Sequence, residues 1–545
     1  MLTTHEVANQ APPVADHDVY AADPALAEAT KREGAAWASD SLHELGRIAG
    51  SAEARDFARL ANEYRPVLET HDRWGRRSDH VEYHPAYHEL MRTAIAQGLA
   101  GAPWADGRAG AHVARAAGFI VWTQIEQGHS CPVSMTYSVI PALRHNTELA
   151  KQWEPGLTSL EYDSRFIQST EKSGLICGMA MTEKQGGSDV RANTSIAREA
   201  GDGTWRLTGH KWFCSAPMSD AFLVLAQAPG GLSCFLAPRV MPDGEANPWM
   251  IQRLKDKLGD RSNASSEVEF ADTFAWPVGD EGRGVPTIIE MVNRTRLDCS
   301  LGSVATMRAA LAQAIHHTRH RSAFGRLLAE QPLMQQVIAD LTVEIEAATI
   351  AAMRLARCHD PALADEHDLA LRRVATPVLK YWVCKRAPGV VAEALECLGG
   401  NGFVEDSGMP RLFRQSPLNG IWEGSGNVIC LDLLRALRSS PESLDAFFAE
   451  IELAAGADVR LDAAAAGLRE QMSIAVESQT LEPAARRIVE RMSLVFQGAL
   501  VVRHAPPQIA DAFCASRLAG DWGVTFGTLP PTCDIPAIAA RNARV

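Results

Sequence analysis

Apolar residues recur three and four positions apart over much of the chain from Pro24 to Ile176, which is the spacing of amphipathic helices. The stretches EARDFARLANEY and HELMRTAIAQGLAG show this pattern best. The residues before Pro24 carry prolines without periodicity, so we expect an extended arm there. The polar segment from His129 to Ser138 contains a proline and is predicted to be a loop. Residues 1–178 are therefore predicted to form an arm followed by an N-terminal helical domain.

The pattern changes between residues 179 and 283, where short, partly alternating runs are separated by Gly, Pro, Asn and Asp. The runs WRLTGHKWF, AFLVLAQ, LSCFLAP and SEVEFADTFAWPV are rich in residues that favour β-strands. We predict a central antiparallel β domain over this segment.

Helical spacing returns after the turn GDEGRG and predicts three long helices that end near Gly399, with a last helix from Ile429 to Leu437. The positions expected to face the core of the first of these helices are Ile288, Met291, Val292, Val304, Met307, Leu311 and Ile315. Residues 284–440 are thus a predicted helical bundle. Beyond the hinge SSPES, the Ala-rich residues 441–545 are predicted to be an extra C-terminal helical domain, so the fold class is α+β, mainly α.

Composition supports a globular multidomain protein, since the 545 residues are 46% hydrophobic and 22% charged. The net charge of −13 removes any whole-protein argument for binding nucleic acid or an anionic membrane, and leaves only local patches. The eleven cysteines are scattered singly, without zinc-site spacing, and are expected to be reduced and buried. The start of the chain lacks the pattern of a secretory signal, and no run reaches eighteen apolar residues, so we expect a cytoplasmic protein without a membrane partner.

The stretch MAMTEKQGGSDVRANT, from Met179 to Thr194, combines two adjacent glycines with the hydroxyls of Thr182 and Ser188. Glycines let backbone N–H groups approach a ligand closely, so this stretch is a candidate binding loop. Taken alone, it could equally be a polar turn at a domain junction. It is neither a P-loop nor a dinucleotide fingerprint, because the spacing of both motifs is missing.

Two further stretches could carry chemistry. In GHKWFCS, an aromatic pair followed by a hydroxyl could cover a planar heterocycle, although the aromatics could also fill the core of the β domain. In GIWEGSGN, Glu423 stands beside Trp422 and Ile421, whose burial would raise the pKa of the carboxyl toward that of a useful general base. The alternative for Glu423 is a solvated loop glutamate.

The order of these stretches resembles that of the acyl-CoA dehydrogenase superfamily. The chain also shows KLGDRSNASSEVEF, WPVGDEGRG, RTR, RSAFG and LGGNGF in the family's order before the glutamate turn. Two further features resemble the alkylation-response flavoproteins of the AidB type. They are the extra length after Ser440 and the sequences MTEKQGGSDV, KDKLGDRSNAS and IWEGSGN. This resemblance implies a helical domain, a β domain and a second helical bundle around FAD.

The resemblance also implies which residues contact FAD. The residues of the binding loop and of the β domain that match the family are Met181, Thr182, Gly187, Ser188, Phe213, Cys214 and Ser215. The matching residues of the glutamate turn are Trp422, Gly424, Ser425 and Asn427. Arg321, Phe324, Gly399 and Gly400 resemble residues that reach the FAD of a neighbouring subunit, which implies a homotetramer built as a dimer of dimers. Glu396 departs from the glutamine usual in the family and would repel a pyrophosphate.

In the resemblance, Glu423 matches the base that removes the α-proton of an acyl-CoA thioester, and Arg296 matches an arginine near that base. The backbone N–H of the glutamate has the family role of binding the thioester carbonyl. An alternative for Arg296 is an ion pair with Asp298 or Glu290 on the surface of a helix. No metal site is expected, because no Cys, Asp or Glu joins the histidines near His316 at ligand spacing.

A second function is implied by the AidB-type resemblance, namely a DNA-binding protective flavoprotein with little dehydrogenase activity. Its contacts with double-stranded DNA would come from Arg486, Arg487, Arg491 and Arg503. Acidic residues outnumber basic ones in the C-terminal segment, so these arginines could instead form a solvated helix face with intrahelical ion pairs.

Overall fold

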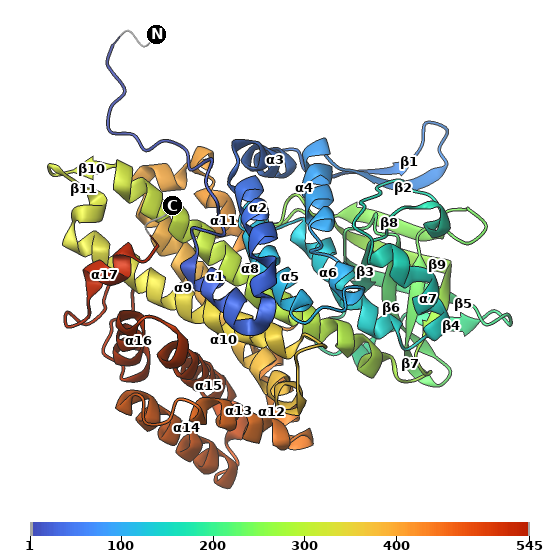
Figure 1. Ribbon diagram of the computed structural model, residues 1–545. Coiled ribbons are helices and arrows are strands. Elements are labelled where there is room, and N and C mark those ends of the chain that lie inside the picture. Colours follow the sequence, from blue (N-terminus) through green and yellow to red (C-terminus); the bar gives the residue numbers. More distant parts are fainter. Residues whose placement is uncertain (1–3, 543–545) are drawn as a thin grey trace. The chain divides into compact units, whose positions relative to one another are not determined.

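The computed structural model describes residues 4–542 (Figure 1). These residues divide by their contacts into two compact units. Unit 1 contains residues 4–52, 109–125 and 299–542, and unit 2 contains residues 53–108 and 126–298. The long helix α8 (Gly284–His320) contributes residues to both units. All seven core positions predicted on this helix are buried, which confirms the helical periodicity of the sequence.

Unit 2 is organised around a seven-stranded sheet in the order β3-β6-β4-β5-β9-β7, in which β8 pairs with β9. A further pairing of β7 with β6 closes the strand order on itself. The strands of the sheet are β3 (Cys177–Ala180), β4 (Ile196–Glu199), β5 (Trp205–Ser215), β6 (Ala221–Ala228), β7 (Gly231–Pro238), β8 (Trp249–Leu254) and β9 (Ser265–Val278).

The four strands predicted from the sequence are confirmed as β5, β6, β7 and β9. The prediction of a purely antiparallel domain is wrong in one respect, because β6 pairs in parallel with both β3 and β4. These two strands have only four residues each, too few to display a period.

The remaining elements of unit 2 precede the sheet in the chain. They are α3 (Ala52–Glu63), β1 (Val67–His71), β2 (Arg77–Glu82), α4 (Pro85–Ala96), α6 (Ser130–Leu143) and α7 (Thr147–Leu157). The predicted loop from His129 to Ser138 is wrong, since it forms most of the buried helix α6. Pro132 lies in the first helical turn, where no N–H is needed, and the Thr136 hydroxyl accepts a hydrogen bond from the backbone N–H of Cys177 at 3.1 Å.

Unit 1 is helical apart from one short hairpin. Its elements before residue 440 are α1 (Pro24–Thr30), α2 (Ser39–Gly50), α5 (Ala111–Thr123), β10 (Ser322–Ala323), β11 (Arg326–Leu327), α9 (Pro332–Cys358), α10 (Glu366–Glu396), α11 (Met409–Gln415) and α12 (Gly426–Ser439). The three long helices predicted by the sequence are confirmed as α8, α9 and α10, and the predicted last helix is α12.

The segment after residue 440 is helical, as predicted, and belongs to unit 1. It comprises α13 (Glu442–Glu452), α14 (Val459–Glu477), α15 (Leu481–His504), α16 (Pro507–Phe513) and α17 (Ile535–Ala540). Helices α13 and α15 pack on α10, and α15 also packs on α9. Glu450, 1% exposed, joins these helices through ion pairs of 2.8 Å with Arg354 and Arg503.

The predicted arm has no helix or strand between residues 4 and 23 and lies on unit 1. Asn9 binds the backbone of Ser322 in both directions, at 2.7 and 2.8 Å, and its own carbonyl accepts a hydrogen bond from Arg321. All eleven cysteines are buried free thiols, as expected. No helix in the described residues has the length and apolar character needed to cross a membrane.

Candidate functional site

The candidate binding loop connects β3 to β4, so that Met181 and Thr182 directly follow a fully buried strand. Gly187 packs against Thr182, because a Cβ at this position would lie 2.3 Å from the threonine hydroxyl oxygen. Gly186 adopts a φ of +143°, which side chains rarely adopt. Ser188 is exposed beyond this tight turn. The loop therefore presents backbone and a hydroxyl to its surroundings, as an anion or heterocycle site requires.

A buried ion pair attaches this loop to β5. The Nζ atom of Lys211 lies 2.8 Å from Glu183 Oε1, and neither side chain is exposed. Glu183 also accepts hydrogen bonds from the backbone N–H groups of Thr194 and Ser195, at 2.7 and 3.1 Å, and from Gln185 at 2.8 Å. Burial alone would raise the pKa of Glu183, but these partners outweigh it and hold the pKa below its usual value. The pair joins the two sequence motifs into one structural element.

Strand β5 presents Phe213 and Ser215 on one face and Cys214 on the other, because successive side chains of a strand alternate. Phe213 is 51% exposed although it is a large apolar ring. Cys214 is fully buried, and burial raises the pKa of its thiol to about 12. The prediction that Cys214 contacts a cofactor is therefore wrong for its side chain, because that side chain faces the core of the β domain.

The glutamate turn lies in unit 1, directly before α12. Glu423 is half-buried and has a φ of +57°, and Gly424 follows with a φ of +104°. A residue with a side chain rarely adopts this left-handed conformation, and such strain is concentrated at functional sites. Ile421 is 63% exposed, so the prediction that it shields the carboxylate is wrong. Only Trp422, which is half-buried, retains that predicted role.

The Nζ atom of Lys380, on α10, donates hydrogen bonds to the carbonyl oxygens of Trp422, at 2.8 Å, and of Gly424. The Trp422 indole N–H donates to Asn419 Oδ1 at 2.8 Å, and the Asn419 amide donates to the Ser303 hydroxyl at 3.2 Å. The turn is thus held by Lys380 of α10 and by Asn419, which in turn binds Ser303 of α8.

The start of α12 carries the other predicted residues of the turn. Ser425 is the N-cap residue, and both Ser425 and Asn427 are exposed. The Asn427 side-chain oxygen accepts a hydrogen bond of 3.2 Å from Arg486, whose Nε also donates to the Tyr381 hydroxyl. Arg486 therefore belongs to the surroundings of the glutamate turn.

The residues predicted to serve a neighbouring subunit are all in unit 1. Phe324 is 98% exposed at the tip of the β10-β11 hairpin, with a φ of +52°. Gly399 and Gly400 are exposed at the start of a short 3-10 segment (Gly399–Phe403). Arg321 precedes the hairpin and binds the arm through the Asn9 carbonyl.

Arg296 is buried on α8, with 5% of its surface exposed, and Asp298 is buried as well. Arg296 therefore does not lie on a solvent-exposed face of the helix, as the alternative of a surface ion pair required. Glu290 instead lies 3.6 Å from Arg294. Burial of the arginine is consistent with its predicted place at a site rather than on a solvated face.

The four arginines predicted to contact DNA do not form one exposed set. Arg503 pairs with the buried Glu450, and Arg486 binds Asn427 and Tyr381. Arg486, Arg487 and Arg491 are exposed on α15, and Arg487 and Arg491 lie one turn apart.

The sequence motifs do not reveal the supporting residues Glu183, Lys211 and Lys380. The first two lie within the motifs MTEKQGGS and GHKWFCS, but the first motif also contains Lys184, so the sequence does not show which charges pair. Lys380 lies in the apolar stretch PVLKYWV, and a lysine in such a stretch is the one signal of a buried charge.

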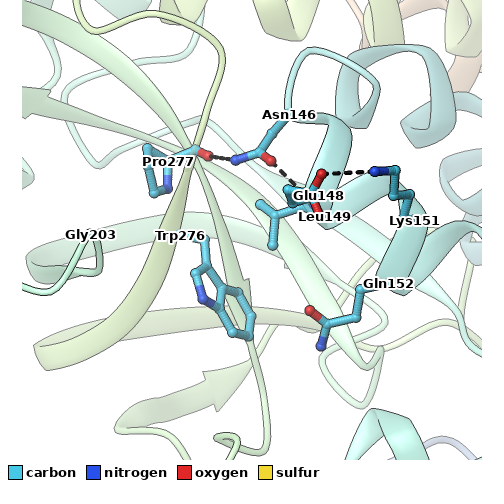
Figure 2. A pocket seen from close by; sticks show the side chains of 8 residues that line it. All are labelled: Asn146, Glu148, Leu149, Lys151, Gln152, Gly203, Trp276 and Pro277. Carbon is cyan, nitrogen blue, oxygen red and sulfur yellow. Dashed lines mark hydrogen bonds and ion pairs between the residues drawn. The ribbon is translucent and has the colours of Figure 1, made fainter.

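A separate shallow pocket lies in unit 2 at the start of α7 (Figure 2). The Asn146 amide donates a hydrogen bond to the Pro277 carbonyl oxygen at 2.9 Å, and Lys151 Nζ lies 2.9 Å from Glu148 Oε1. None of the predicted site residues lines this pocket. Among the described residues, no group of three His, Cys, Asp or Glu side chains could hold a metal ion.

Comparison with known proteins relates the whole chain to one family. Residues 9–164 match the adaptive response protein AidB N-terminal domain, residues 178–273 the acyl-CoA dehydrogenase middle domain, and residues 282–438 the acyl-CoA dehydrogenase C-terminal domain. The chain is 44% identical to AidB of Escherichia coli (strain K12) over 526 residues, or 96% of each protein.

More distant relatives agree with this match. Acyl-CoA dehydrogenase family member 11 of Caenorhabditis elegans is 29% identical over 90% of this chain and 84% of its own length. The crystal structure of Caenorhabditis elegans ACDH-11 in complex with C11-CoA superposes with a TM-score of 0.87 at 26% identity, covering 95% of this chain and 94% of that one. The chain therefore belongs to the acyl-CoA dehydrogenase family and is of the AidB type.

Proposed function

We propose that this protein is an FAD-dependent oxidoreductase that removes one hydrogen from the α-carbon and one from the β-carbon of an acyl-CoA thioester. Its family is that of oxidoreductases acting on acyl-CoA. The relative from Caenorhabditis elegans, crystallised with C11-CoA, supports an acyl-CoA as the ligand class.

The residues that would hold FAD fit a planar heterocycle with a pyrophosphate. Phe213 offers an exposed aromatic face, and Ser215 lies on the same side of β5. The backbone of Met181, Thr182 and Gly187 and the exposed Ser188 supply donors for the polar edge and the phosphates. When bound, FAD supplies the hydride acceptor that no side chain can provide.

The observation that carries the proposal is the left-handed backbone of Glu423 in a half-buried turn. In this reaction the Glu423 carboxylate takes the α-proton while the hydride leaves the β-carbon, so the position of the carboxylate matters more than its basicity. Arg296 would adjust the charge near the base or the substrate, and its burial strengthens that effect.

The test is the reduction of bound flavin by acyl-CoA thioesters of increasing length, followed by visible absorbance. Glu423→Gln keeps the shape of the turn and removes the base, so FAD should stay bound while reduction slows by about 10²–10⁴-fold. Glu442→Gln, on the exposed start of α13, is the matched control and should behave as the parent does. A Glu423→Gln variant that reduces its flavin at the parent rate would refute the assignment.

We also propose that the active form is a homotetramer, a dimer of dimers in which Arg321, Phe324, Gly399 and Gly400 contact the FAD of another subunit. The exposure of Phe324 at the tip of its hairpin supports this proposal. Light scattering of the flavin-loaded protein tests it, and a stable, fully loaded monomer would contradict it.

A second candidate function is binding of double-stranded DNA in the response to alkylation damage. The observation that favours it is the exposed pair Arg487 and Arg491 on α15. DNA affinity that depends on these arginines must weaken with salt, whereas flavin reduction should not.

A further inference from the structure

Lys380 is a charged residue in a fully buried position. It lies on α10, and its side chain is 1% exposed. Among the residues that the structure describes, its only hydrogen-bond partners are the carbonyl oxygens of Trp422 and Gly424, and no carboxylate pairs with it. These two carbonyls belong to the residues immediately before and after Glu423.

A buried ammonium group without a carboxylate partner is costly, because it has lost its hydration and gains only hydrogen bonds. A methionine would fill nearly the same space without this cost. Packing alone therefore does not account for a lysine here. Its location indicates what the charge does, since both hydrogen bonds go to the backbone of the glutamate turn and none to the surrounding helices.

The two hydrogen bonds fix the direction of two peptide groups. In a trans peptide the carbonyl and the following N–H point to opposite sides, and no cis peptide occurs in the described residues. Lys380 at the Trp422 carbonyl therefore aims the N–H of Glu423 away from α10. In the same way, Lys380 at the Gly424 carbonyl aims the N–H of Ser425 away from α10.

A positive charge on a carbonyl also polarises the peptide group and makes its N–H a stronger donor. The same contacts brace the left-handed conformation of Glu423, which would otherwise relax toward a common backbone conformation. The Lys380 ammonium group thus stabilises the backbone conformation of Glu423 and also strengthens the Glu423 N–H as a donor.

We propose that Lys380 is a positioning residue for dehydrogenation: it holds Glu423 in its left-handed conformation and strengthens the Glu423 N–H as a donor to the thioester carbonyl oxygen. This inference rests on the proposed function. As the α-proton leaves, negative charge develops on the carbonyl oxygen, and a donor oriented in advance stabilises that charge in the transition state. Lys380 does not touch the substrate, so it should affect the rate of proton removal far more than substrate affinity.

The experiment compares Lys380→Met with the parent protein, both loaded with FAD, by rapid mixing with C11-CoA. We expect the rate constant of flavin reduction to fall at least about tenfold, with the dissociation constant of C11-CoA within about threefold of the parent. Lys31→Met is the control, because Lys31 is exposed at the end of α1 and forms no hydrogen bond with the turn. Its rate should equal that of the parent.

A second measurement isolates proton removal. An acyl-CoA with sulfur in place of the β-carbon can lose its α-proton but cannot transfer a hydride from that position. In D₂O the parent should exchange this α-hydrogen for deuterium, as followed by mass spectrometry, and Lys380→Met should slow the exchange by the same factor as flavin reduction. Lys380→Gln keeps a neutral donor, so its exchange rate should lie between those of the parent and of Lys380→Met.

The outcomes separate the two proposals. If C11-CoA and its homologues do not reduce the flavin of the parent, and the analogue with sulfur at the β-position does not exchange its α-hydrogen, the proposed function is wrong and this inference falls with it. If the parent is active and FAD-loaded Lys380→Met matches it in both measurements, the positioning role alone is wrong. If neither Lys380→Met nor Lys380→Gln retains FAD and fold, the lysine serves folding and the positioning role is also overturned.

Discussion

Replacing Glu183 with glutamine should loosen the loop between β3 and β4 while changing no more than one heavy atom. Glu183 Oε1 accepts from Lys211 Nζ and from the Ser195 N–H, and Oε2 accepts from Gln185 and from both the N–H and the hydroxyl of Thr194. A glutamine amide nitrogen cannot accept any of these bonds. In either orientation of the amide, Lys211 keeps its charge in a fully buried position and loses its counter-charge.

Removing one partner of a buried ion pair costs about 3–5 kcal/mol, because the remaining charge stays desolvated. Since about 1.4 kcal/mol corresponds to a factor of ten, the open population of the loop should rise by about two to three and a half orders of magnitude. Hydrogen–deuterium exchange of a peptide that contains Thr194 and Ser195 measures this population directly. The dissociation constant of FAD, measured by flavin fluorescence, should rise in parallel if the loop binds the cofactor.

Two further variants check the electrostatic origin of the effect. Glu183→Gln combined with Lys211→Met removes the stranded charge and should recover part of the lost protection. Glu199→Gln, on the exposed end of β4, changes the same functional group outside the pair and should leave exchange unchanged. Exchange at Thr194 and Ser195 in Glu183→Gln within about threefold of the parent would refute the reasoning.

The other predictions concern more distant parts of the chain. Burial would raise the pKa of Glu450, but Arg354 and Arg503 hold it at about 2, so this carboxylate contributes stability above pH 4.5 and loses it as the pH falls toward 2. This contribution to the free energy of unfolding is about 3 kcal/mol at neutral pH. In urea unfolding, the parent should lose this stability as the pH falls from 4.5 to 2, whereas Glu450→Gln should not. If the protein binds DNA through α15, replacing Arg487 and Arg491 with alanine should reduce the slope of log affinity against log salt by about two phosphate contacts, and an unchanged slope would exclude this face.

The sequence by itself determined the elements whose pattern is local. The helical period on α8 identified seven positions that are all buried, because a helix that packs on a core repeats its apolar residues every turn. The strands β5, β6, β7 and β9 were equally recognisable, since each is long enough to show its composition between turn residues. The motif order likewise indicated the family, which the comparisons confirm.

Tertiary structure decided what depends on partners that are distant in the sequence. The segment after His129 looked like a loop because of its hydroxyls and proline, yet it is a buried helix whose Thr136 binds the N–H of Cys177. Arg503 looked available for DNA until the fold placed the carboxylate of Glu450 against it. The free energy of a polar side chain depends on its desolvation and on its partners, and the local pattern encodes neither.

Lys380 shows most clearly what the sequence specifies and what only the folded structure specifies. Its sequence neighbours indicate only that a lysine occupies an apolar stretch of a long helix. The packing of α10 against the glutamate turn, across 42 positions of sequence from Lys380 to Trp422, gives that charge its two carbonyl partners. Local sequence therefore specified the helix and the turn, while their approach in the folded chain specified which backbone groups the buried charge would hold, because electrostatic interactions depend on distance in space.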